Sequence, residues 1–183
     1  MTTYWEKFAM KNILLHLALT LALLTISACG GGDGGGGGVI TPVAKTTAYL
    51  TVSLNGTLPA STSIAGAAFT LTLPAGVTPA TTNGEVSSGV VKPSGTFAGG
   101  TQTPPVYTAA SGTLQVALAN SIPAGVTQVG EVATITLQLA NGATPTAGSF
   151  GVSGVNVIDA TLYAPIAGMN VIVSNITLQY PRQ

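Results

Sequence analysis

The stretch VATITLQL, residues 132–139, indicates the class of fold. From Ala133 onward, apolar and polar residues alternate, so every second side chain falls on the same face of an extended strand. This pattern is typical of an antiparallel strand with one face in a core and the other in water. The stretch therefore predicts a half-buried β-strand.

Similar alternation occurs on both sides of this stretch, with turn signals between the segments. Glycine supplies positive φ and proline presets φ in turns such as Asn55-Gly56 and Asn141-Gly142. Repeated strands and turns without helical periodicity indicate a sandwich or barrel. We predict one all-β domain over residues 47–183, an antiparallel β-sandwich of the jelly-roll type. The other expected strands are 49–54, 67–73, 113–118, 150–158 and 170–180.

One part of this domain has a weaker pattern. Residues 77–105 contain short apolar pairs and a lone aromatic, Phe97. We interpret this segment as a strand pair with a long loop, in which Phe97 is a candidate for exposure.

The composition is unusually poor in charge. The 183 residues include five Lys+Arg and five Asp+Glu, with a net charge of zero, and 46% of the residues are hydrophobic. Too little charge is present for a disordered polyelectrolyte, and five scattered cations cannot form the basic face of a nucleic-acid binder. We therefore expect a folded protein that does not bind nucleic acid.

The N-terminal part has the pattern of a secretory signal. A short start with Lys11 precedes an apolar run over residues 13–24 and then small residues. The run is shorter than the ~20 residues of a membrane-spanning helix. We predict a signal peptide over residues 1–28, with both Met1 and Met10 open as its start.

The end of this signal resembles the lipobox of bacterial lipoproteins: residues 26–29 read ISAC, and Cys29 is the only cysteine. The resemblance implies cleavage before Cys29 and acylation of that residue, so the protein would be anchored to a membrane through lipid. Gly30, rather than aspartate, follows Cys29, which favours the outer membrane of a Gram-negative bacterium. The glycine-rich residues 29–46 predict a flexible tether.

Four segments of the predicted domain, taken in order, resemble cohesin domains. They are residues 66–77 (GAAFTLTLPAGV), 112–118 (GTLQVAL), 130–139 (GEVATITLQL) and the following strand that ends at Asp159. The resemblance implies a sandwich of about nine strands, related to carbohydrate-binding modules. Cohesins bind dockerins, so it also implies docking of a protein partner.

Three kinds of binding follow as hypotheses. The leading one is a non-catalytic module that docks a dockerin or another surface protein. One alternative is a polysaccharide-binding module that stacks sugars on Tyr107 and Tyr163, and a second is a structural cell-surface subunit joined through exposed strand edges. The outward residues expected to contact a protein partner are Thr113, Gln115, Thr134, Thr136 and Gln138.

Catalytic groups are scarce after the predicted signal peptide. No histidine remains, so a nucleophile–histidine pair cannot be built. The carboxylates of the domain are dispersed, which gives a poor metal site, and we expect neither a metal nor a cofactor. One alternative stays open: Glu85 paired with Glu131 or Asp159 as the two carboxyl groups of a glycosidase. The sequence otherwise favours binding over catalysis.

Overall fold

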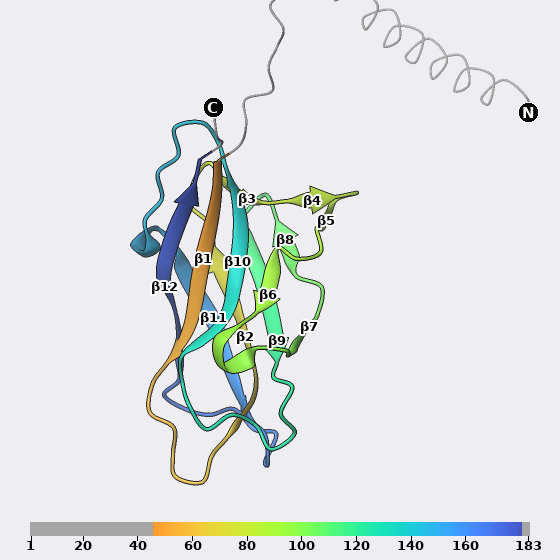
Figure 1. Cartoon of the computed structure of the whole chain (residues 1–183), viewed down its shortest axis with the longest axis vertical. Helices are drawn as coiled ribbons and strands as arrows, with labels where there is room; N and C mark the ends of the chain where they lie inside the picture. The colour runs from red at the N-terminus through yellow and green to blue at the C-terminus, as the bar shows by residue number, and fades with distance from the viewer. Residues whose placement is uncertain (1–45, 181–183) are drawn as a thin grey trace, which may run out of the picture. The chain divides into compact units, whose positions relative to one another are not determined.

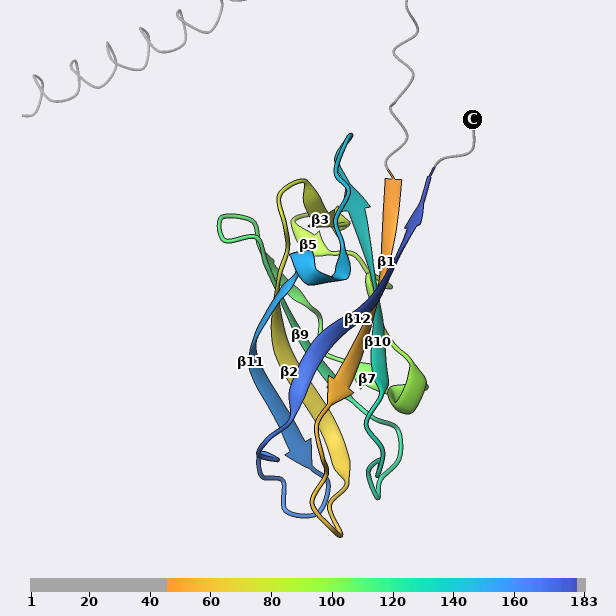
Figure 2. The same ribbon diagram turned by 90° about the vertical axis from the view of Figure 1, so that its left-hand side faces the viewer.

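The computed structural model describes residues 46–180, which belong to one compact unit, Pro42–Gln183. Two antiparallel sheets pack face to face as a sandwich, and the described residues form no α-helix (Figures 1 and 2). The all-β sandwich predicted from the sequence is therefore confirmed. The predicted signal peptide, Cys29 and the tether up to residue 45 lie outside the described residues.

Within residues 46–180, no helix is both long enough and apolar enough to cross a membrane.

The first sheet, sheet A, has the order β12-β1-β10-β3, and β6 also pairs with β10. The second, sheet B, has the order β11-β2-β9-β7, and β8 also pairs with β9. All the pairings are antiparallel, and β4 and β5 form a separate small hairpin. The strands of sheet A are β1 (Thr46–Asn55), β3 (Val77–Pro79), β6 (Val91–Pro93), β10 (Glu131–Leu139) and β12 (Asn170–Gln179). Those of sheet B are β2 (Ile64–Thr72), β7 (Thr101–Gln102), β8 (Val106–Thr108), β9 (Thr113–Ala119) and β11 (Gly151–Asp159), and the hairpin consists of β4 (Thr81–Thr82) and β5 (Glu85–Val86).

The described part has twelve strands, whereas the resemblance implied about nine. Six of the twelve, β3 to β8, are only two or three residues long. They occupy residues 77–108, where proline and glycine recur, and two of them, β3 and β6, end at a proline. The six long strands are the segments in which the alternation is clear.

Four of the five connections between successive long strands pass from one sheet to the other, since of these successive pairs only β2 and β9 share a sheet, and the loops gather at two ends of the sandwich. The described chain enters at Thr46, where the start of β1 pairs with the end of β12 near Gln179 (Figure 1). The opposite end, called the far end here, carries the loops after β1, β9 and β11. Ser63 Oγ donates to the carbonyl of Ala124 at 2.7 Å, and Ala160 N–H donates to the carbonyl of Ser63, so these loops contact one another.

The core lies between the inner faces of the sheets and follows directly from the alternation. Leu50 and Ile135 of sheet A and Leu71 and Leu114 of sheet B have no exposed surface. Burying such a side chain contributes roughly 1.5–3 kcal/mol each. No disulfide supports the core, because the described residues contain no cysteine.

Phe97 is placed differently from the prediction. It lies in η1 (Gly95–Phe97), a short 3-10 turn, and is 0% exposed. Thr96 Oγ1 donates to the carbonyl of Glu131 at 2.9 Å, and Ser94 N–H donates to the carbonyl of Val132 at 3.0 Å. These bonds hold the turn against β10 and point the ring into the core. Phe97, a candidate for exposure from the sequence, is buried, because a lone aromatic in a turn has no periodicity that reveals its direction.

Candidate functional site

The five predicted partner-binding residues lie on two opposite faces of the sandwich. Thr113 and Gln115 are on β9 in sheet B, whereas Thr134, Thr136 and Gln138 are on β10 in sheet A. All five alternate with buried residues and therefore point outward. The structure thus brings two of them together on one face and three on the other, so they do not form a single surface.

The outer face of sheet A is largely polar. Thr136 pairs with Tyr49, which pairs with Thr177, and Tyr49 Oη donates to Gln179 Oε1 at 2.9 Å. Tyr49, in the middle of the face, is 37% exposed. Among the residues that the structure describes, the strand positions of two charged residues place them on this face: Lys92 on β6, and Glu131, which pairs with the outward-facing Ser53. Hydroxyl and amide groups therefore dominate this surface.

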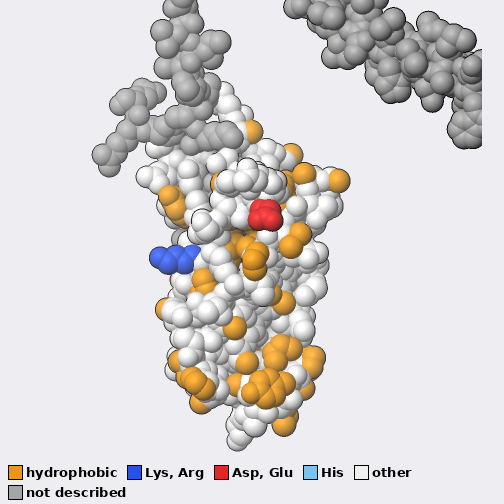
Figure 3. Space-filling view, turned by 90° about the vertical axis from the view of Figure 1, so that its right-hand side faces the viewer, with side chains coloured by type: hydrophobic (Ala, Val, Ile, Leu, Met, Phe, Trp, Pro, Cys, Tyr) orange, Lys and Arg blue, Asp and Glu red, His pale blue; other side chains and the backbone are white. Residues whose placement is uncertain are grey.

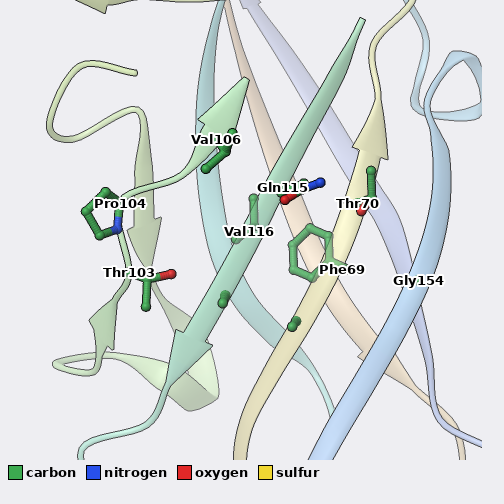
Figure 4. A pocket seen from close by; sticks show the side chains of 10 residues that line it. Phe69, Thr70, Thr103, Pro104, Val106, Gln115, Val116 and Gly154 are labelled. Atoms are coloured by element: carbon green, nitrogen blue, oxygen red, sulfur yellow. The ribbon is translucent and has the colours of Figure 1, made fainter. Parts of the chain in front are cut away.

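The outer face of sheet B is hollowed instead. An open depression of about 220 Å³ lies over β2 and β9, and Gln115 and Thr70 stand side by side in it (Figure 4). Val106 and Pro104 border it on one side and Gly154 of β11 on the other (Figure 4). No charged residue lines this depression, which we call the sheet-B hollow.

The hollow exists because two neighbouring strands carry small residues at the same level. Ala68 on β2 pairs with Ala117 on β9, and both point outward. Beside them, the backbone N–H of Thr103 donates to the carbonyl of Ala117 at 3.2 Å, which holds the 103–106 segment as a wall. Val106, at the top of this wall, is 54% exposed. The hollow therefore combines an apolar rim, a small floor and three hydrogen-bonding side chains, those of Thr70, Thr103 and Gln115.

The two tyrosines predicted to stack sugars are not brought together. Tyr107 pairs with the inward-facing Leu114 and is half-buried against the core. Tyr163 lies at the far end, is 78% exposed and has a positive φ of 53°. Leu162 in the same loop and Ile122 in the β9–β10 loop are also largely exposed. In Figure 3, hydrophobic side chains gather toward the lower end of the molecule, which is the far end of Figure 1.

Asp159 holds the loop that presents Tyr163. Its Oδ1 accepts the backbone N–H of Leu162 at 2.6 Å and that of Thr161 at 2.7 Å, and the residue is 5% exposed. The hydrogen bond from the Leu162 N–H lowers the pKa of the Asp159 carboxyl, and burial opposes this shift only in part. Ionised Asp159 therefore stabilises the folded loop.

A pH dependence follows from this lowered pKa. A carboxylate with a lower pKa in the folded state stabilises it fully above its unfolded pKa, ~3.9, and the contribution disappears as pH falls through the folded value. We expect the unfolding midpoint of wild type in denaturant to fall from about pH 4 downward. Asp159→Asn keeps an oxygen acceptor but cannot titrate, so its midpoint should fall less over the same range. Equal acid sensitivity of the two proteins, measured by circular dichroism, would contradict the assignment.

The three carboxylates of the described residues lie on three different elements. Glu85 is in the β5 hairpin, Glu131 begins β10 in sheet A, and Asp159 ends β11 in sheet B with its Oδ1 bound to backbone N–H groups. Within residues 46–180, no three of the side chains His, Cys, Asp and Glu gather as metal ligands would. The candidate site offers hydrogen bonds and apolar contact, which suit binding.

Comparison with protein-family models, with curated proteins and with solved structures found no match to this chain.

Some residues that shape these surfaces were missed in the sequence. Asn120 Oδ1 accepts the N–H of Ile122 at 2.6 Å, and its Nδ2 donates to the carbonyls of Ile64 and Ala65. Asn120 thus ties the β9–β10 loop to β2 at the far end. An Asn or Asp directly after a strand is a signal for such turns, and Asp159 carries the same signal.

Proposed function

We propose that this chain is a lipid-anchored lipoprotein, exported and held at the outer membrane, whose non-catalytic domain docks a partner protein. The observation that carries the proposal is the sheet-B hollow with Gln115 and Thr70 in it. The lipobox-like residues 26–29 and the glycine-rich segment after them support anchoring and reach. The cohesin-like order of strands in the sequence supports protein docking as the role.

The chemistry of the hollow favours a protein over a charged ligand. An apolar side chain of a partner fits the depression between Val106 and Gly154, above Ala68 and Ala117. Gln115 and Thr70 can then pair with the backbone N–H and C=O groups of the same segment. Interfaces of this kind gain most from a few side chains seated in a pocket. Specificity would come from shape and hydrogen bonding, because the lining is uncharged.

A polysaccharide is the second candidate, favoured by Tyr163 alone. This ring is 78% exposed at the far end, and Asp159 holds its loop. An exposed tyrosine offers an apolar face with a polar tip, as sugar binding requires. Tyr107 is half-buried, so a platform of two tyrosines is not part of this candidate.

Matched charge variants on the two faces test the docking proposal. Full-length protein in nanodiscs is exposed to the secreted proteins of the same cell, and bound protein is quantified by interferometry and identified by mass spectrometry. We expect Gln115→Lys to weaken binding at least tenfold, because an unpaired charge must then be desolvated in the hollow. Gln138→Lys, the same change on the outer face of sheet A, should leave the affinity within about twofold.

Other outcomes would overturn the proposal. Loss of binding on Gln138→Lys but not on Gln115→Lys would move the docking surface to sheet A. Retardation in gels that contain polysaccharide, abolished by Tyr163→Ala with no protein bound, would assign the second candidate instead. Absence of any bound protein would remove the docking function.

A further inference from the structure

The two sides of the sandwich differ in how their edge strands are protected. On the β3/β6/β7/β8 side the strands have two or three residues, and Pro79, Pro93 and Lys92 lie in them. Short strands, proline and lysine are the usual means of preventing edge pairing. On the other side, where β11 and β12 lie next to each other, the edge strands have nine and ten residues (Figure 2).

β12 is the less protected of these two long edges. It pairs only with β1 among the described strands, and its sequence NVIVSNITLQ contains neither charge nor proline. A bulge near Ser174 interrupts its register, but Asn175–Gln179 pair with β1 without a shift. The turn η2 (Ala147–Ser149) contacts β12, yet the N–H groups of Ser149 and Phe150 donate within that turn. The regular outer edge from 175 to 179 therefore offers backbone groups to another strand.

We propose that this edge pairs with the same edge of a second copy of the chain, antiparallel, about a two-fold axis at Thr177. This proposal rests on the self-complementary order of residues 175–179. About this axis, Thr177 faces Thr177 of the second copy, Ile176 faces Leu178, and Asn175 faces Gln179. Hydroxyl thus meets hydroxyl, aliphatic meets aliphatic, and amide meets amide, which are favourable cross-strand pairs.

The inner side of the edge gains from the same pairing. Ile176 and Leu178 point toward the core but are only half-buried, because β12 has no neighbour beyond it in the described part. In the paired edges these side chains cover one another across the axis. An isologous contact of this kind closes as a dimer and does not propagate into a fibre.

The position of the axis also suits a protein anchored at one end. Residue 177 lies close to the end of β12, beside the start of β1, so both copies begin their described chains near the axis. From Cys29 to Lys45 each copy has 17 further residues, which span at most roughly 60 Å when extended. Both chains therefore reach one membrane surface, where confinement raises the local concentration and supports a contact of only five residues per copy.

Site-specific photo-crosslinking tests the dimer in the intact membrane. A photoreactive amino acid replaces Asn175 in the full-length chain, and crosslinked peptides are mapped by mass spectrometry. We expect a product of twice the monomer mass, with the crosslink in residues 175–180 of the second copy. Adding Thr177→Lys should lower its yield at least tenfold, because two like charges then face each other. Co-expression of Thr177→Lys with Thr177→Glu copies should restore the yield.

Thr78→Lys is the matched control, an exposed threonine at the opposite edge of the same face of sheet A. It should leave the crosslink yield unchanged. Unaltered circular dichroism and unfolding midpoints establish that each variant folds. The pairing would be overturned by monomer alone, by a crosslink to another protein or to β11, or by longer oligomers. It would also be overturned if the crosslink yield lost on Thr177→Lys were not restored by co-expressed Thr177→Glu copies. The pairing rests on the lipid anchor of the proposed function, but its results are independent of the sheet-B hollow, so failure of docking at the hollow and failure of the pairing are distinguishable.

Discussion

Phe97→Ala is expected to lower the free energy of unfolding by about 3–5 kcal/mol, the range for truncating a buried aromatic residue. Phe97 is 0% exposed and is the largest of the fully buried side chains in the described part. Its removal leaves a cavity in a closely packed interior, which relaxes only partly. The loss should appear as a lower midpoint in chemical denaturation with an unchanged slope.

Tyr163→Ala is the control for this prediction. Both aromatics lie outside the long strands, but Tyr163 is 78% exposed at the far end. Its truncation should change the free energy of unfolding by no more than about 0.5 kcal/mol. Similar losses for the two variants would mean that Phe97 does not occupy the core as the structure places it.

Gly95→Ala is the second large effect, with an expected loss of about 2–5 kcal/mol from backbone strain and overpacking together. Gly95 has a φ of 55°, in the left-handed region that L-residues enter at a cost. A Cβ there would lie 2.6 Å from the Cβ of Glu131 and closer still to its carbonyl oxygen. Alanine would therefore push η1 away from β10 and draw Phe97 out of the core.

Gly84→Ala separates the two causes. Gly84 also has a positive φ, 86°, but no atom lies within 4 Å of a Cβ built there. The Gly84→Ala variant should lose only the part of the free energy of unfolding that comes from backbone strain, about 1–2 kcal/mol. The difference between the two variants in the same denaturation experiment measures the contact with Glu131. If Gly95→Ala lowered the free energy of unfolding no more than Gly84→Ala, the close packing of η1 on β10 would be refuted.

The long strands could be predicted because they are half-buried. Residues 132–139 alternate because β10 has one face against the core and the other exposed, and the same holds for β2 and β9. The short strands of residues 77–108 could not be predicted in the same way. Two or three residues contain no period, and the pairing partners of β3, β6, β7 and β8 on β9 and β10 lie farther along the chain.

The candidate site could be predicted only in part. The outward direction of Gln115 and Gln138 follows from local alternation, so it could be predicted. The sequence could not predict that these two residues lie on opposite faces, because alternation does not assign a strand to a sheet. The sheet-B hollow was hidden for the same reason: it needs Ala68 and Ala117 at one level, and only the register of β2 against β9 sets that.

The sequence by itself therefore determined the all-β class, the long strands, the inward and outward sides of each and the scarcity of charge. These properties depend on composition and on residues within a few positions of one another. The tertiary structure decided which strands share a sheet, where the hollow lies, that Phe97 is buried and that β12 is an open edge. Each of these depends on contacts between residues far apart in the chain, and local periodicity carries no information about such contacts.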